Sequence, residues 1–150
     1  MRLTANKRNI LQQSILSVND GVLSAISVIM IMSGQNFIRP WIGVVAGGLL
    51  AMGSANYISV SAIANQQNKY SPNQTVLFSS IAYFIGAIIP VIPLIFINNF
   101  IASLVVSFIF LLVIGYKNNG KTNKIVSAIR QGFLGIFVAV VTYYLGLYFG

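Results

Sequence analysis

The chain has 150 residues, of which 57% are hydrophobic and 7% are charged, and its formal net charge is +8. Soluble domains carry about 25% charged residues, so this composition excludes a soluble globular protein. The chain contains no cysteine, no histidine and one acidic residue, which excludes disulfides, thiolate metal sites and the commonest general base. The basic residues flank apolar runs, which indicates orientation in a membrane rather than binding to nucleic acid.

Five apolar runs are each close to the length of about 20 residues that a transmembrane helix needs. A basic start followed by an apolar run is also typical of a signal peptide. The first run, however, is long, contains Asn19 and Asp20, and is followed by no clear cleavage site. The predicted fold is all-α, a polytopic membrane protein with one transmembrane domain over residues 1–150. Its five helices are expected at about 14–33, 41–64, 75–97, 100–116 and 126–149.

The links between the runs predict how the helices connect. Only Asn98 and Asn99 separate the third run from the fourth, so these two helices should form a tight antiparallel hairpin. Basic residues then predict the orientation, because cytoplasmic loops carry an excess of Lys and Arg. The predicted orientation places the N-terminus in the cytoplasm and the C-terminus outside it. In this orientation Arg39 is the only basic residue in the outer segments. The inner segments hold Arg2, Lys7, Arg8, Lys69, Lys117, Lys121 and Lys124, with Arg130 near the same side.

Asp20 is the only acidic residue, and it lies about 8 Å inside the first predicted helix. An acid within a membrane helix indicates a cation or proton site. The alternative is an acid stabilised by the dipole at the helix start, or paired with Arg130 or Lys7. Ser24 and Ser27 follow Asp20 at i+4 and i+7 and share its helix face. This face predicts a hydrated ion path, or else small polar residues at a helix contact.

The second predicted helix carries two patterns with four-residue spacing. Gly48, Met52 and Asn56 form one, in which the Met52 thioether and the Asn56 carbonyl suit a borderline first-row divalent ion. Met52 can equally be a packing residue. The other pattern is a stripe of small residues that lets another backbone approach closely. This small-residue stripe consists of Gly43, Gly47, Ala51, Ala55 and Ser59.

Pro90 and Pro93 lie in the third predicted helix, and each lacks the backbone N–H that a carbonyl one turn earlier would accept. Such a kinked stretch can flex or coordinate a cation, or it can be purely structural.

No nucleophile–base pair can be assembled from this composition. The glycine-rich stretch 43–48 lacks the strand context of a phosphate-binding loop. An enzyme is therefore not expected.

Four motifs resemble, in order, those of the vacuolar iron transporter family. Ser14-Ile-Leu-Ser-Val-Asn-Asp-Gly-Val-Leu-Ser resembles its first-helix signature, whose core is Asn-Asp-Gly. Met52-Gly-Ser-Ala-Asn-Tyr-Ile-Ser-Val-Ser is similar to its second-helix signature, Met-x-x-Gly-Glu-Tyr-Val-Ser-Val. Pro90-Val-Ile-Pro resembles its third-helix Pro-x-x-Pro. Arg130-Gln-Gly-Phe-Leu-Gly, followed by Thr142-Tyr-Tyr-Leu-Gly, resembles its fifth helix.

The resemblance implies a homodimer of five-helix subunits with a path for Fe²⁺ or Mn²⁺ near the dimer interface. It also implies export from the cytoplasm coupled to proton entry, with Asp20 and Met52 matching the family's functional Asp and Met. This sequence departs from the family at two places. Asn56 replaces the second-helix Glu, and the short segment 65–74 stands where many members have a Glu-rich cytoplasmic domain.

The leading hypothesis is thus a divalent iron or manganese transporter in a bacterial inner membrane or an organelle membrane. The ion is a substrate, and no resident cofactor is expected. Asp20 would supply negative charge, and Met52 and Asn56 would supply ligands for the ion. Ser24 and Ser27 would give the path a polar lining, and Pro90 and Pro93 would shape it. One alternative is a non-transporting family member that serves as a membrane scaffold or partner subunit. Another is a carrier for a different small solute.

Overall fold

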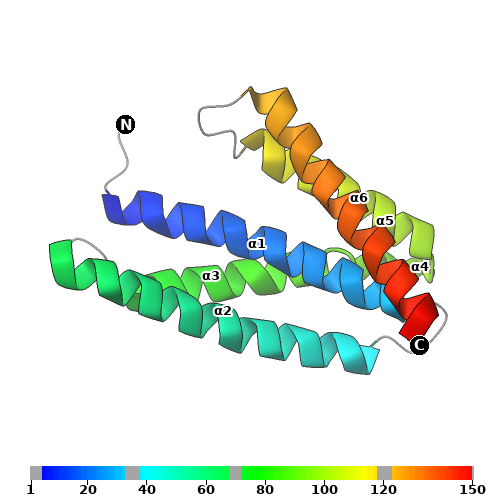
Figure 1. Cartoon of the computed structure of the whole chain (residues 1–150), viewed down its shortest axis with the longest axis horizontal. Helices are drawn as coiled ribbons and strands as arrows, with labels where there is room; N and C mark the ends of the chain where they lie inside the picture. The colour runs from blue at the N-terminus through cyan, green and yellow to red at the C-terminus, as the bar shows by residue number, and fades with distance from the viewer. Residues whose placement is uncertain (1–4, 33–37, 68–71, 118–122, 150) are drawn as a thin grey trace.

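The computed structural model describes residues 5–32, 38–67, 72–117 and 123–149. Within these ranges the chain is almost entirely helical and contains no strand (Figure 1). Arg2, Lys69 and Lys121, which the orientation prediction uses, lie outside the described residues. The helices are α1 (Ala5–Ile31), α2 (Ile38–Gln67), α3 (Pro72–Ile88), α4 (Ile92–Ile97), α5 (Phe100–Lys117) and α6 (Lys124–Phe149).

Five segments of the described chain are long and apolar enough to cross a membrane, which confirms the predicted all-α polytopic fold. Because five is an odd number, α1 begins and α6 ends at opposite ends of the long axis (Figure 1). Which side of the membrane each end faces stays a prediction. The spans are Ile10–Ile31, Pro40–Ser59, Pro72–Ile97, Phe100–Lys117 and Lys124–Tyr148.

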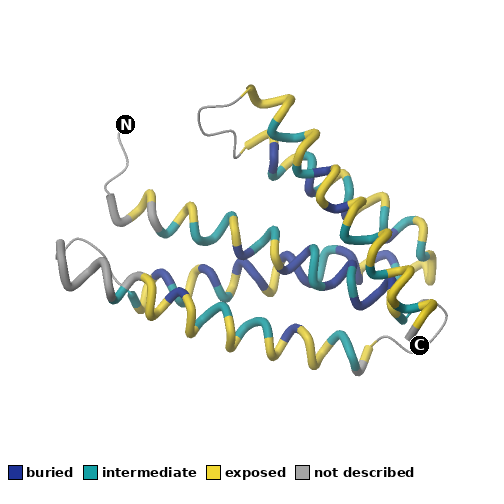
Figure 2. The backbone as a smooth tube through the Cα atoms, viewed as in Figure 1, coloured by how far each residue is buried: buried dark blue, intermediate teal, exposed yellow. Residues whose placement is uncertain are grey.

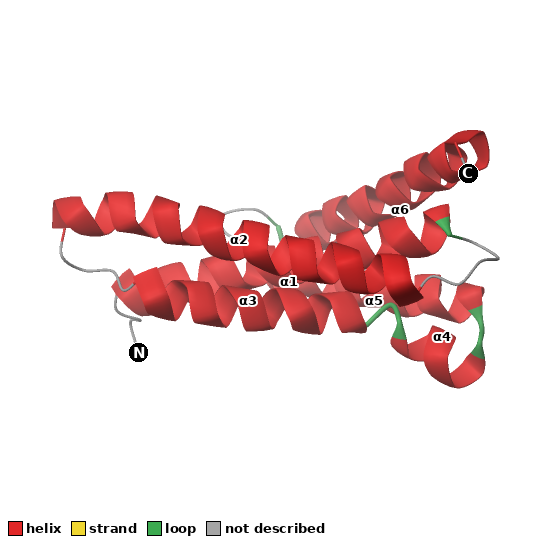
Figure 3. Ribbon diagram, turned by 90° about the horizontal axis from the view of Figure 1, so that it is seen from below, coloured by secondary structure: helices red, strands yellow, loops and turns green. Residues whose placement is uncertain are grey.

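The third span is broken into two helices, where the sequence predicted one kinked helix. α3 ends at Ile88, Pro90 lies in the turn, and Pro93 falls in the first turn of α4 (Figure 3). Proline has no N–H to donate and disfavours the helical conformation of the residue before it, so two prolines three residues apart end one helix and begin another. The Ser103 hydroxyl of α5 donates a hydrogen bond to the Pro90 carbonyl and ties this turn to the next helix.

The predicted tight turn at Asn98 and Asn99 is present, but the hairpin it makes is short. Asn98 adopts the left-handed conformation (φ 48°), and its N–H donates to the Leu94 carbonyl at 3.1 Å. The Asn99 side chain accepts a bond from the Ala102 N–H at 3.0 Å and caps α5. Only α4 pairs with α5 in this hairpin. α3 packs mainly on α1 and α2, and α5 packs mainly on α6.

The helices form two groups, α1–α3 and the α5–α6 hairpin, and α1 contacts both (Figure 1). Burial is concentrated along α1 and α3 (Figure 2). One core cluster consists of Val22, Ile26, Met30 and Leu111, between α1 and α5. Most large side chains on the outer surfaces are exposed and apolar, for example Phe96 at 81%, which suits contact with lipid.

Two glycines let α1 and α3 approach backbone to backbone. A Cβ on Gly21 would lie 2.2 Å from the Tyr83 carbonyl oxygen, and one on Gly86 would lie 2.1 Å from that of Val18. No side chain larger than hydrogen fits at either position. This close approach fixes the part of α1 that carries Asp20 against α3.

Candidate functional site

Asp20 is exposed on the surface of the single chain, although it lies within the first membrane span. The next residue, Gly21, is buried against α3. Among the described residues, no basic side chain forms an ion pair with Asp20, so the predicted alternative partners Lys7 and Arg130 do not neutralise it. Tyr83 is close enough to interact with it electrostatically.

Tyr83 of α3 is the residue around which the three helices of the first group meet. It is 1% exposed, and its hydroxyl interacts with that of Ser24 on α1. Its hydroxyl also lies against α2, since a Cβ on Gly48 would be 2.0 Å from that oxygen. Met52 packs at the edge of the apolar cluster that Tyr83 forms with two neighbours. Tyr83 thus lies between the Asp20 face of α1 and the Gly48–Met52 face of α2.

Sequence reasoning did not select Tyr83, but a signal for it exists. Thr75, Ser79 and Tyr83 recur every four residues along α3, and all three are at most 1% exposed. A polar stripe on an otherwise apolar membrane helix indicates a face turned toward other helices.

The predicted face of Gly48, Met52 and Asn56 exists, and it packs on α3. Asn56 is 6% exposed, and its side-chain amide donates to the Ser79 hydroxyl at 2.7 Å. Ser79 in turn donates to the Val76 carbonyl at 3.1 Å. Asn56 therefore contacts α3 one helical turn away from Tyr83 and joins two helices.

The remaining predicted path residues lie apart from Tyr83. The Ser27 hydroxyl donates to the Leu23 carbonyl of its own helix at 2.8 Å, so it is satisfied locally. Pro90 and Pro93 are buried at the break between α3 and α4. The Pro90 carbonyl already accepts the bond from Ser103. The structure thus places Asp20 and Ser24 near Tyr83 and Met52 against the cluster that contains Tyr83, whereas Ser27, Pro90 and Pro93 lie outside this group.

The small-residue stripe of α2 faces away from the rest of the chain. A Cβ placed on Gly43 or Gly47 would have no heavy atom within 4 Å. Ala51, Ala55 and Ser59 are exposed as well. Within the described part of the single chain, the close backbone approach expected at this stripe is therefore not made.

A second link between polar side chains was also missed. The Gln131 amide of α6 donates a hydrogen bond to the Asn19 side chain of α1, next to Asp20.

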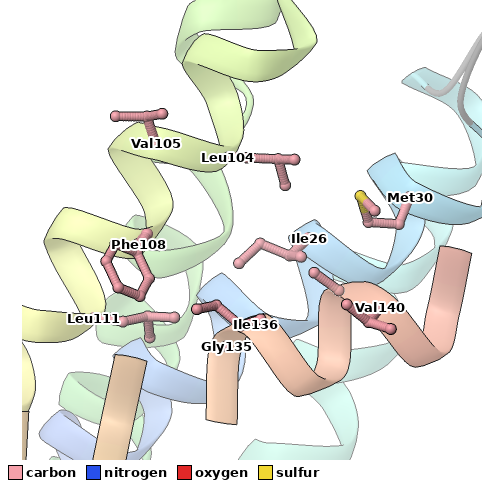
Figure 4. A pocket seen from close by; sticks show the side chains of 10 residues that line it. Ile26, Met30, Leu104, Val105, Phe108, Leu111, Gly135, Ile136 and Val140 are labelled. Carbon is pink, nitrogen blue, oxygen red and sulfur yellow. The ribbon is translucent and has the colours of Figure 1, made fainter. Parts of the chain in front are cut away.

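A cavity of about 350 Å³ lies between α1, α5 and α6 (Figure 4). Its walls, which include Ile26, Met30 and Leu111, are apolar and offer an ion no oxygen ligand.

The model of the VIT family matches residues 62–147, which is more than half of the chain and runs from the end of α2 to the last turn of α6. A search of curated proteins found no match. The matched residues include both halves of the broken third span and the Arg130 and Thr142 motifs. With five membrane-spanning segments and this match over most of them, the protein belongs to the VIT family.

Proposed function

We propose that this protein moves Fe²⁺ or Mn²⁺ out of the cytoplasm, as a homodimer, with Asp20 of both copies on the ion path. Membership of the VIT family indicates a membrane transporter of metal ions. The identity of the ion, the direction and coupling to proton entry belong to the proposal.

The observation that carries the proposal is the environment of Asp20. Asp20 lies at the middle of the span Ile10–Ile31, and a charged Asp at the centre of a membrane helix costs about 2.5–3.5 kcal/mol on insertion scales. Asp20 is nevertheless exposed on a membrane span, without an ion pair in the described structure. A second copy and a bound cation would cover it, and two carboxylates would neutralise one divalent ion.

The chemical types of the proposed ligands favour a transition-metal ion. Met52 supplies a polarisable sulfur near Tyr83, and Ser24 supplies a hydroxyl on the Asp20 face of α1. Sulfur and oxygen ligands together suit Fe²⁺ or Mn²⁺ better than Mg²⁺ or Ca²⁺. The open stripe on α2 offers a surface on which a second copy can approach closely.

The test is metal flux into proteoliposomes that hold the purified protein, with Fe²⁺ and Mn²⁺ measured with and without a pH gradient. We expect Asp20→Asn to lower flux by at least about tenfold, as loss of a metal-site group does. Met52→Leu conserves volume and should keep the fold while changing the preference between the two ions. Ser54→Ala is the matched control, since that hydroxyl is exposed and donates only to Leu50 of its own helix.

Equal flux in wild type and Asp20→Asn, with both proteins inserted and of the same size, would reject the role of Asp20. A flux that depends on Asp20 but is indifferent to the pH gradient would reject proton coupling alone.

A second candidate function is a non-transporting scaffold or partner subunit. One observation favours it. Asn56 stands where the family resemblance places a Glu, and its amide is used to hold α3 through Ser79. A protein of this kind would insert and assemble but carry neither ion in the flux assay, so the same measurement separates the two functions.

A further inference from the structure

A groove of about 460 Å³ lies between the first half of α1 and the second half of α5. The α5–α6 hairpin diverges from α1 toward this end of the molecule (Figure 1). The groove lies within two membrane-spanning segments, so lipid chains are its natural surroundings. Six apolar side chains form its walls, Leu11, Ile15 and Val18 from α1 and Phe110, Val113 and Ile114 from α5.

One end of the groove carries positive charge. Lys117, the last residue of α5 and of its membrane span, is exposed and lines the groove. Lys7 precedes the lining residues Leu11 and Ser14 by four and seven positions, so it continues the same face of α1 one turn outward. Lys7 is exposed too. α1 begins at the membrane side where α5 ends, so both cations lie on that side.

We propose that this groove binds an anionic phospholipid, with an acyl chain between α1 and α5 and the headgroup phosphate on Lys117 and Lys7. The apolar walls match an acyl chain, and the cations at the mouth match a phosphate at headgroup depth. Long basic side chains at helix ends reach the interface while their stems stay in apolar surroundings. The cavity between α1, α5 and α6 has no charged lining residue and would show no such headgroup preference.

The test uses fluorescence quenching by brominated lipids. Trp41 is the only tryptophan, so Trp41→Phe gives a silent background. Phe110→Trp then reports on the groove. Phe133→Trp is the matched control, because Phe133 is 66% exposed on α6 and lies at a similar distance along its helix from the same end. Reconstitution in mixed vesicles presents both leaflets with the same lipids, so the result is independent of orientation.

We expect brominated phosphatidylglycerol to compete for position 110 about fivefold better than brominated phosphatidylcholine, the effect of roughly one cation near a phosphate. Position 133 should show no preference. Lys117→Gln should remove most of the preference at 110, and high salt should weaken it. Lys124→Gln should not, because that ammonium lies 5.6 Å from the Tyr116 ring centre, outside the groove lining.

Equal quenching by both lipids at position 110 would overturn the proposal. So would protection of position 110 from both lipids, which would mean that a second copy covers the groove. Lipid retained on the wild-type protein, counted by native mass spectrometry, gives a check without any tryptophan variant. Phosphatidylglycerol should be retained by wild type and Lys124→Gln and lost from Lys117→Gln, and equal retention in all three would also reject the site.

Discussion

At the scale of single residues, glycines of the same appearance in the sequence have opposite surroundings in the fold. Gly43 and Gly47 belong to a clear four-residue pattern, yet they face outward from the chain. Gly21 belongs to a shorter small-residue stripe with Ser17 and Ala25, and Gly86 follows Ala82 by four positions; both glycines lie against the backbone of the facing helix. Which four-residue pattern is covered within the chain follows from the crossing of α1 and α3, and not from the pattern within either helix.

We predict that Gly86→Leu destabilises the subunit, because its Cβ would overlap the Val18 carbonyl of α1. Overpacking of this kind costs about 1–3 kcal/mol or more. Thermal unfolding in detergent, followed by circular dichroism, measures the effect. Ala46→Leu is the control and should leave the midpoint nearly unchanged, since Ala46 is exposed and lies outside the small-residue stripe. Equal midpoints for Gly86→Leu and wild type would show that α1 and α3 do not cross there.

At the scale of elements, α3 is the helix on which the site depends. Its buried polar stripe of Thr75, Ser79 and Tyr83 meets α2 through Asn56 and α1 through Ser24. The sequence placed Met52 and Asn56 on one face of α2 and Asp20 and Ser24 on one face of α1, since helical periodicity is local. It did not indicate that Tyr83 would join these two faces.

We predict that the Asn56–Ser79 hydrogen bond couples α2 to α3 by about 0.6 kcal/mol, the average for such bonds in membrane proteins. A double-mutant cycle of Asn56→Leu and Ser79→Ala, with unfolding in mixed micelles, measures this coupling. Pairing Asn56→Leu with Ser54→Ala is the control, because Ser54 bonds only within its own helix. Additive effects in the first cycle would mean that the bond contributes nothing to the contact.

At the scale of the whole molecule, two features on which the proposed function depends are exposed on membrane spans of the described chain. One is Asp20, and the other is the small-residue stripe of α2. Aromatic and branched side chains on the outer faces of α5 and α6 are suited to lipid, whereas a carboxylate is not. A second copy that packs on α2 would bury the stripe and bring two Asp20 side chains into one assembly.

We predict that Gly47→Leu converts the proposed dimer to a monomer, because Leu blocks close approach at a small-xxx-small contact. Light scattering after size exclusion measures the mass. Ala46→Leu adds the same side chain at an exposed position outside the stripe and should leave the dimer intact. If wild type is already monomeric, or if Gly47→Leu keeps the wild-type mass, the stripe is not the subunit contact.

The sequence by itself determined the membrane class, the five spans and the turn at Asn98 and Asn99. These properties depend on the apolar content of each run and on the residue types between runs, which are local. It also singled out Asp20, the only acidic residue of the chain. The roles predicted for Asp20, Met52 and Asn56 in metal transport stay predictions that the flux experiment tests.

Only the tertiary structure decided which helices pair, where the third span breaks, and which patterned faces are covered. The α4–α5 hairpin is short because the break at Pro90 changes the direction of the chain after α3. As a result α5 packs mainly on α6 and not on α3. The contact of Tyr83 with Ser24 joins residues 59 positions apart. Such contacts depend on the angles and distances between packed helices, and helical periodicity within one segment contains no information about them.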